Sequence, residues 1–196
     1  TETYYEDPDN RGNPDLGAES AWVADVGVDF QWAPGWRVAA HAFARLEEDI
    51  IDYVRRRDTP PWEARNLGEM RTIGGQVLLA GDWRTCKPQV SYAWTGKEQA
   101  LAPELESKYV FAHPRHQLKA SVRHPLGAGL QTSWSVSASE RGPLDDYATV
   151  EVAVSRSLER ARLTVRIHNL TDARYEAIRG VPVPGRWVRV ETQLEL

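Results

Sequence analysis

Apolar and polar residues alternate along most of this 196-residue chain, which is the pattern of β-strands rather than helices. From Leu130 to Ala138 every second position is Leu, Thr, Trp, Val or Ala, and the positions between are Gln or Ser. Comparable alternation occupies residues 22–32, 36–47, 73–79, 89–94, 117–123, 150–154, 162–168 and 188–196. The pattern therefore predicts about nine strands, most of them about ten residues long, the length that a tilted strand needs to cross a bilayer.

The connections between these strands alternate between short and long. The short ones are residues 33–35, 82–87, 125–129 and 158–161. The long ones are residues 1–18, 53–70, 96–115, 139–146 and 169–186. Outer-membrane barrels have this layout, with short periplasmic turns and long extracellular loops. The fold class predicted is thus all-β, an antiparallel transmembrane β-barrel wall.

A soluble antiparallel sheet also alternates, so it is the competing interpretation. The predicted strands are longer than soluble strands usually are, and their polar face carries Ser, Gln, Arg, Asp and Glu, as a wet lumen requires. Trp32, Trp36 and Trp83 lie at strand ends beside short turns, whereas Trp94 and Trp187 lie near long loops. Two aromatic girdles would produce this placement, so the membrane wall is favoured.

Composition narrows the class of protein further. The chain has 8 Trp and 7 Tyr against 3 Phe, a bias towards rings that suit an interface between apolar and wet surroundings. No run of apolar residues is long enough for a spanning helix, and no secretory signal precedes the first strand. Cys86 is the single cysteine, so an internal disulfide is excluded. The net charge of -4 argues against nucleic acid as a partner.

An odd number of strands cannot close into a bacterial single-chain barrel, and unpaired edges in lipid are costly. We therefore expect this chain to be a portion of a larger barrel.

Several local sequences resemble the last third of TonB-dependent outer-membrane receptors. They occur in the order of that family, at residues 12–19 (GNPDLGAE), 43–51 (FARLEEDII), 66–75 (NLGEMRTIGG), 114–116 (PRH), 167–175 (IHNLTDARY) and 180–186 (GVPVPGR). The last two are the most specific, because they resemble the turn and returning loop before the terminal strand. Three positions depart from the family pattern: Gln76 replaces the usual Glu, Glu191 stands where a Gly is common, and Leu196 stands where the family usually ends in an aromatic residue.

The resemblance implies that residues 1–196 form the carboxy-terminal portion of a 22-stranded, plugged barrel in the bacterial outer membrane. Its partners would be outer-membrane lipid and lipopolysaccharide, the plug domain and remaining strands, and the TonB energy-coupling complex, reached through the missing part. The implied function is energy-coupled import of a scarce, large nutrient, with a ferric siderophore favoured and haem or cobalamin as alternatives. The resemblance implies no enzymatic activity and no cofactor.

Candidate ligand-binding residues lie in the long loops, because lipid-facing walls cannot carry recognition. They offer positive charge beside aromatic surface, which suits a large anionic chelate. They are Arg55, Arg56, Arg57, Trp62, Arg65, Tyr109, His113, Tyr175 and Arg179. The competing interpretation is a loop that pairs with lipopolysaccharide phosphate or with nearby Glu. Turn formation explains Asn169 and Asp172, whose short side chains bond nearby backbone.

Two other functions stay open on the sequence alone. A passive porin or structural barrel would share the strand pattern. A barrel hydrolase would need a catalytic set at the outer rim, for which Asp145, Asp146 and either His113 or His116 are the candidates. The two His residues are separated by a Pro and lack an adjacent carboxylate, so no metal site is predicted. Charged residues of the polar face are expected to form ion networks; they are Arg37, Arg45, Arg123, Arg162, Arg166 and Arg189 with Asp25, Asp29, Glu47 and Glu151.

Overall fold

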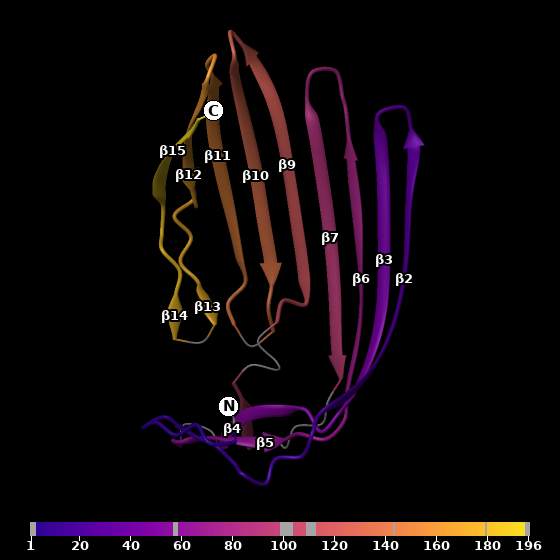
Figure 1. The fold of residues 1–196 in the computed structure, drawn as a ribbon, viewed down its shortest axis with the longest axis vertical. Helices are drawn as coiled ribbons and strands as arrows, with labels where there is room; N and C mark the ends of the chain where they lie inside the picture. Colours follow the sequence, from indigo (N-terminus) through magenta and orange to yellow (C-terminus); the bar gives the residue numbers. More distant parts are fainter. Residues whose placement is uncertain are drawn as a thin grey trace. The chain divides into compact units, whose positions relative to one another are not determined.

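The computed structural model describes residues 3–56, 59–98, 104–108, 113–142, 144–178 and 180–194, and for Ile178 the backbone alone. These residues form strands, turns and irregular connections (Figure 1). Among them there is no helix long and apolar enough to cross a membrane.

Nine strands form one sheet in the order β15-β12-β11-β10-β9-β7-β6-β3-β2, so β15 and β2 lie at its two edges. Their bounds are β2 Ser20–Ala33, β3 Trp36–Glu48, β6 Met70–Gly81, β7 Lys87–Glu98, β9 His116–Gly127, β10 Leu130–Glu140, β11 Tyr147–Ser157, β12 Ala161–His168 and β15 Trp187–Leu194. The predicted set of about nine long strands is confirmed. Sheet neighbours are also chain neighbours except where a long connection contributes small strands of its own.

The chain divides into two compact units, each described here by itself. The first unit comprises residues 1–26, 42–75 and 95–113, and the second comprises residues 27–41, 76–94 and 114–196.

Antiparallel pairing in the second unit separates apolar from polar side chains. Val136 of β10 lies opposite Val150 of β11 and Ala120 of β9, whereas Ser135 lies opposite Glu151 and Ser121. Because successive residues of a strand point to opposite faces, one face of this sheet is apolar and the other polar. The apolar face is left uncovered: Trp134 is 45% exposed and Val136 is 42% exposed. This is the inside-out arrangement of a barrel wall.

The backbone of the short turn between β9 and β10 requires small residues. Gly127, Ala128 and Gly129 all have positive φ, a conformation that glycine adopts without cost. A Cβ added at Gly129 would meet the carbonyl oxygen of Ser157 at 3.0 Å. Glycine therefore allows the turn to pass close to the end of β11.

The long connections of the first unit are more ordered than the sequence pattern predicts. They contribute a separate four-stranded sheet, in the order β1-β5-β4-β8, with bounds β1 Asn10–Arg11, β5 Trp62–Asn66, β4 Ile51–Arg56 and β8 Leu105–Ser107. The pairing of β1 with β5 is parallel. Alternate positions of β4 are buried, with Val54 1% exposed, and on the other face of the sheet Ala64 of β5, which lies opposite Tyr53, is 0% exposed. These strands are too short for alternation to reveal them.

Asn169 and Asp172, for which the sequence predicts a turn role, stabilise the last long connection, residues 169–186. Asn169 has φ 50°, its Nδ2 donates to the carbonyl of Ala173 at 2.8 Å, and its Oδ1 accepts from the Ala173 amide at 2.9 Å. Asp172 accepts from the amide of Arg186 at 2.8 Å, and a Cβ at Gly185 would come within 2.5 Å of its Oδ1. The predicted turn roles of Asn169 and Asp172 are confirmed. Two short strands, β13 Glu176–Ile178 and β14 Val181–Pro182, pair within the loop.

Candidate ligand-binding site

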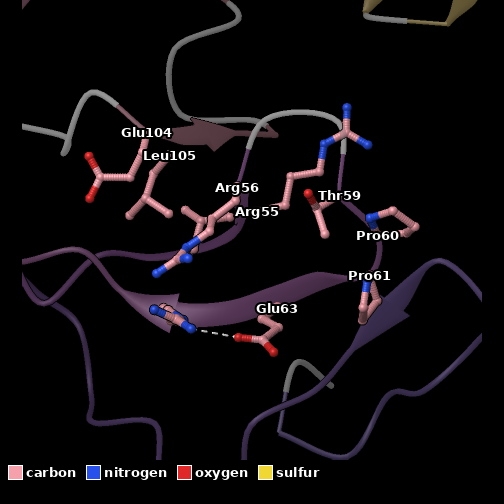
Figure 2. A pocket seen from close by; sticks show the side chains of 10 residues that line it. Arg55, Arg56, Thr59, Pro60, Pro61, Glu63, Glu104 and Leu105 are labelled. Atoms are coloured by element: carbon pink, nitrogen blue, oxygen red, sulfur yellow. Dashed lines mark hydrogen bonds and ion pairs between the residues drawn. The ribbon is translucent and has the colours of Figure 1, made fainter.

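A cavity of about 390 Å³ lies in the first unit, against the small four-stranded sheet. Three stretches of chain line it: Val54 to Arg56 from β4, the stretch around the start of β5 with Thr59, Pro60, Pro61, Glu63 and Arg65, and Glu104 with Leu105 at the start of β8. Figure 2 shows these side chains from close by. Three of the predicted ligand-binding residues, Arg55, Arg56 and Arg65, line this cavity.

Arg55 is fixed by two partners. The register of β4 with β8 sets Arg55 opposite Glu106, and the guanidinium donates to the Glu106 carboxylate at 3.1 Å and 3.2 Å. The same guanidinium lies 4.3 Å from the ring centroid of Trp62, within the range of a cation–π contact. Both Arg55 and Glu106 are mostly buried, so the guanidinium is held in one place.

A second cation, Lys108, which directly follows β8, lies near the Trp62 ring. Lys108 lies 5.7 Å from the Trp62 ring and 5.7 Å from the Tyr53 ring, and its ammonium donates to Asn10 Oδ1 at 2.6 Å. Sequence reasoning missed Lys108 and Glu106, because a strand of three residues gives no periodic signal. Arg55 and Trp62 therefore help to hold the four-stranded sheet together, and their role as ligand contacts stays a prediction.

The remaining charges of the cavity are of both signs. Arg65 is paired with Glu63 at 2.7 Å, and the dashed line at Glu63 in Figure 2 marks this ion pair. Arg56 and Glu104 are both exposed, and within the described part of the chain neither side chain has a partner. Of the arginines that line the cavity, Arg56 is thus the one whose guanidinium pairs with none of the described residues, and Glu104 is an exposed carboxylate in the same lining.

The other predicted site residues divide into three groups. Arg57, Tyr109 and Arg179 lie outside the described residues. His113 is half-buried in the first unit and does not line the cavity. Tyr175 belongs to the second unit, where its ring stacks on Tyr147 with centroids 3.8 Å apart. The structure thus brings together Arg55, Arg56, Trp62 and Arg65 of the predicted set.

Tyr175 is part of a loop anchor built around a buried arginine. Arg141 is 4% exposed, and its guanidinium donates to the carbonyls of Asp145, Glu176 and Ala177. It lies 4.8 Å from the Tyr147 ring and 5.8 Å from the Tyr175 ring. Burial, with a further contribution from Tyr147, raises the pKa of Tyr175, so its phenol stays protonated. The cluster ties two loops of the second unit together.

Several of the charged residues predicted on the polar face form ion pairs. Arg37 pairs with Asp29, Arg45 with Glu47 at 2.8 Å, and Glu151 accepts from both Arg166 and His168. The ring of His168 also stacks on Trp187 with centroids 3.9 Å apart. Beside this network, a polar cavity of about 230 Å³ is lined by Ser135, Ser137, Thr149, Glu151, His168, Asn169, Tyr175, Val183, Pro184 and Trp187.

The geometry bears on the barrel hydrolase, which the sequence left open, and on metal binding. His116 and Asp146 line the same groove, but Nδ1 of His116 contacts the Tyr92 hydroxyl at 2.6 Å. In a catalytic triad that nitrogen would instead donate to the carboxylate, so the arrangement does not favour a hydrolase. Among the described residues, no three His, Cys, Asp or Glu side chains are grouped to hold a metal ion.

Comparison with known proteins agrees with this architecture. A family model described as "TonB dependent receptor-like, beta-barrel" matches residues 1–170. The copper transporter OprC superposes with a TM-score of 0.74 at 14% identity, over 93% of this chain and 32% of that one. The siderophore receptor PirA from Acinetobacter baumannii gives 0.70 at 13% identity, over 94% and 33%. The FrpB iron transporter from Neisseria meningitidis (F3-3 variant) gives 0.69 at 13% identity, over 91% and 31%. A comparison with curated protein sequences gives no match.

The long antiparallel strands, the uncovered apolar face and the charged opposite face define an outer-membrane type of barrel wall. The chain belongs to the TonB-dependent receptor β-barrel family, whose members are outer-membrane receptors and transporters. It spans about a third of the length of the solved structures it matches.

Proposed function

We propose that this chain is part of an outer-membrane receptor that imports a scarce, large nutrient, with energy coupled from the inner membrane. The observation that carries the proposal is the family match over residues 1–170. Proteins with the same fold include an iron transporter, a copper transporter and a siderophore receptor, and a ferric siderophore is the ligand class we favour. Haem and cobalamin are the alternatives.

The second part of the proposal concerns the boundaries of the chain. We infer that residues 1–196 are the carboxy-terminal portion of a 22-stranded plugged barrel, with the plug and earlier strands outside this sequence. In support, the nine-stranded sheet has β2 and β15 at its edges, and lipid cannot satisfy an unpaired strand edge. The lumenal ion networks would then face the plug, and the TonB complex would act through the missing part.

The third part concerns ligand capture. We propose that Arg56, together with its neighbour Arg57, makes the direct contacts with an anionic ligand, while Arg55 and Arg65 line the same cavity and Trp62 supports Arg55. Arg56 is favoured because its guanidinium is exposed and uncommitted, whereas Arg55 and Arg65 are already paired with Glu106 and Glu63. Recognition of carboxylate or catecholate oxygens by an arginine fork is a charge-assisted contact.

Four further residues, Tyr109, His113, Tyr175 and Arg179, complete the proposed capture set. They occupy the other long connections of the predicted barrel, at the end from which a ligand would enter.

Uptake in intact cells tests the proposal. Cells producing the full receptor would be given ⁵⁵Fe complexes of a catecholate, a hydroxamate and citrate, with haem and cobalamin supplied separately. We expect accumulation of one of these, abolished by a protonophore and by deletion of the coupling protein. Accumulation that persists without energy would instead identify a passive porin.

A matched pair of arginine variants tests the site. Replacing Arg56 and Arg57 by Ser should weaken capture about tenfold, as expected for the loss of a charge-assisted pair, and the loss should shrink at high salt. Arg84→Ser is the control, because Arg84 is exposed on a short turn of the second unit. Unchanged affinity in the double variant would assign the run to a solvated or lipopolysaccharide-facing surface.

A further inference from the structure

The polar cavity of about 230 Å³ in the second unit lies against the last long connection, and of its lining residues the ligand-capture proposal uses Tyr175 alone. Its floor is the polar face of the wall, where Ser135 lies opposite Glu151 and Ser137 opposite Thr149 in the register of β10 with β11. The last long connection contributes Asn169, Tyr175, Val183 and Pro184. The cavity therefore lies towards the strand ends that adjoin the long connections, the side from which a ligand would enter.

Four hydroxyl groups of the lining are available to a ligand. They belong to Ser135, Ser137, Thr149 and Tyr175, and none of them is hydrogen-bonded to another residue in the part of the chain that the structure describes. A hydroxyl both donates and accepts a hydrogen bond, so the group is complementary to a ligand that carries several hydroxyls of its own.

The other polar groups of the lining are already paired. The Glu151 carboxylate pairs with Arg166 through one oxygen and with Nδ1 of His168 through the other. The side-chain amide of Asn169 bonds to the backbone of Ala173 through both its oxygen and its nitrogen. No Lys or Arg is among the described residues that line the cavity. The lining thus offers no cation to an anionic ligand and no unpaired carboxylate to a cationic one, which favours a neutral ligand.

Trp187 adds an aromatic surface to this lining. One face of the indole stacks on the His168 ring with centroids 3.9 Å apart, and Trp187 is still 43% exposed. An aromatic ring beside several hydroxyls suits a ligand with C–H groups on its face and hydroxyls around its edge.

The size of the cavity limits the ligand to a single ring. Pockets that enclose a drug-sized molecule measure about 300–1,000 Å³, and this cavity measures about 230 Å³. A whole ferric siderophore, haem or cobalamin is larger than this space. A catechol ring would fit by size, but it carries oxygen on one edge only, whereas the free hydroxyls come from both the floor and the loop.

We propose that this cavity binds one sugar ring of a neutral saccharide. Ser135, Ser137 and Thr149 bond to the sugar hydroxyls from the floor, Tyr175 does so from the loop, and Trp187 packs against the C–H groups of the ring. The proposal adds a ligand class to the receptor, and it stands whether or not the receptor imports a ferric siderophore.

Saturation-transfer difference NMR on the full receptor tests the proposal without any transport assay. Receptor refolded without lipopolysaccharide, in a detergent that has no sugar headgroup, would be titrated separately with the methyl glycosides of glucose, galactose and mannose. We expect saturable binding of at least one of them with a Kd of about 1 mM, the affinity that a ligand of one ring reaches at ordinary efficiency per atom. Cyclohexanol and catechol, rings with fewer hydroxyls, should bind about tenfold more weakly. No saturation transfer to any of the three glycosides, or equal binding of cyclohexanol or catechol, would overturn the proposal.

Three variants test the location of the sugar. Removing two floor hydroxyls together, by Ser135→Ala and Thr149→Val, should weaken binding of the glycoside about tenfold. Ser137→Leu fills the cavity and should abolish binding. Ser133→Ala is the matched control, because Ser133 lies on the same polar face, opposite Ala153, but does not line the cavity.

Unchanged affinity in the double variant, or an equal loss in Ser133→Ala, would overturn the assignment of the sugar to this cavity. Heat-modifiability of each variant confirms that the barrel has formed, so that a loss of binding is not a loss of folding.

Discussion

The two sheets of this chain use apolar side chains in opposite ways. In the small sheet of β1, β5, β4 and β8, apolar residues are buried, with Val54 1% exposed and Ala64 fully covered. In the wall formed by β9 to β12 and β15, apolar residues are uncovered, and Val190 of β15 is 64% exposed. Ser, Glu, Arg and His lie on the opposite, polar face of the wall, where Glu151 pairs with Arg166 and His168.

This difference follows from the solvent that each sheet meets. Burying apolar surface away from water stabilises the small sheet as it would a soluble domain. The wall gains nothing by covering its apolar face, because lipid is itself apolar, and it requires instead that every backbone group be paired within the sheet. A substitution should therefore have effects of different size, and of different cause, in the two sheets.

The largest expected effect is on the wall. Val136→Arg places a charge near the middle of the apolar face and should cost about 2–4 kcal/mol of folding free energy. Ser135→Arg changes the neighbouring residue, which points to the polar face, and should be tolerated. The measurement is a folding titration of the full receptor into lipid vesicles. Equal costs at the two positions would mean that the assignment of the faces is wrong.

The next effect contrasts apolar truncation in the two sheets. Val54→Ala should destabilise the small sheet by about 2 kcal/mol, from lost burial together with the cavity left behind. Val190→Ala on the wall should change the free energy of unfolding by less than about 0.5 kcal/mol. Amide hydrogen exchange of β4 and β5 measures the first, and the folding titration measures the second. A wall variant as costly as the Val54 variant would remove the contrast.

A smaller effect is expected where the wall holds its loops by hydrogen bonds instead of apolar packing. Arg141→Met keeps most of the side-chain volume but leaves the carbonyls of Asp145, Glu176 and Ala177 without their donor. The local cost should be about 1–3 kcal/mol, seen as faster amide exchange in residues 169–178 with unchanged exchange in β4. Slower or unaltered exchange in that loop would show that Arg141 does not anchor it.

The smallest effect concerns pH at the start of the small sheet. Hydrogen bonds from Asn10 and Tyr5, with amide donors from Asp9 and Asn10, lower the pKa of Asp7 from 3.8 to about 2. Because the pKa is lowered on folding, this stabilisation is fully present above the ordinary value and is lost as the pH falls through about 2. Amide exchange at Asn10, corrected for the intrinsic rate, should thus indicate the same protection at about pH 5 as at neutral pH, and a protection that falls progressively between about pH 4 and about pH 2. Loss of protection that begins well above the ordinary pKa, or unchanged protection at about pH 2, would contradict the assignment.

The wall could be predicted from the sequence because the alternation of apolar and polar residues within each strand is a local pattern. Alternation over ten or so residues places Trp134, Val136 and Val150 on one face, and the register confirms it. Turn chemistry likewise identified Asn169 and Asp172 before the loop was seen. The small sheet escaped prediction because β1 and β8 are two and three residues long, and their pairing depends on contacts far apart in the chain.

The candidate site could be read from the sequence only in part. The run of arginines at 55–57 is visible as a charge pattern, and two of them, Arg55 and Arg56, line a cavity. That Arg55 is committed to Glu106 and Trp62, while Arg56 is not, depends on the register of β4 with β8. No local pattern encodes that register, so only the structure shows which of the arginines is already paired.

Site-directed spin labelling along β10 tests the inside-out wall most directly. With Cys86 replaced by Ser, single cysteines at positions 133 to 138 of the full receptor would be labelled in vesicles, and collision with oxygen compared with collision with a water-soluble nickel chelate. We predict oxygen-accessible labels at 134, 136 and 138 and labels shielded from oxygen at 133, 135 and 137. A uniform profile along the strand, or the opposite phase, would contradict the assignment of this sheet to a membrane barrel.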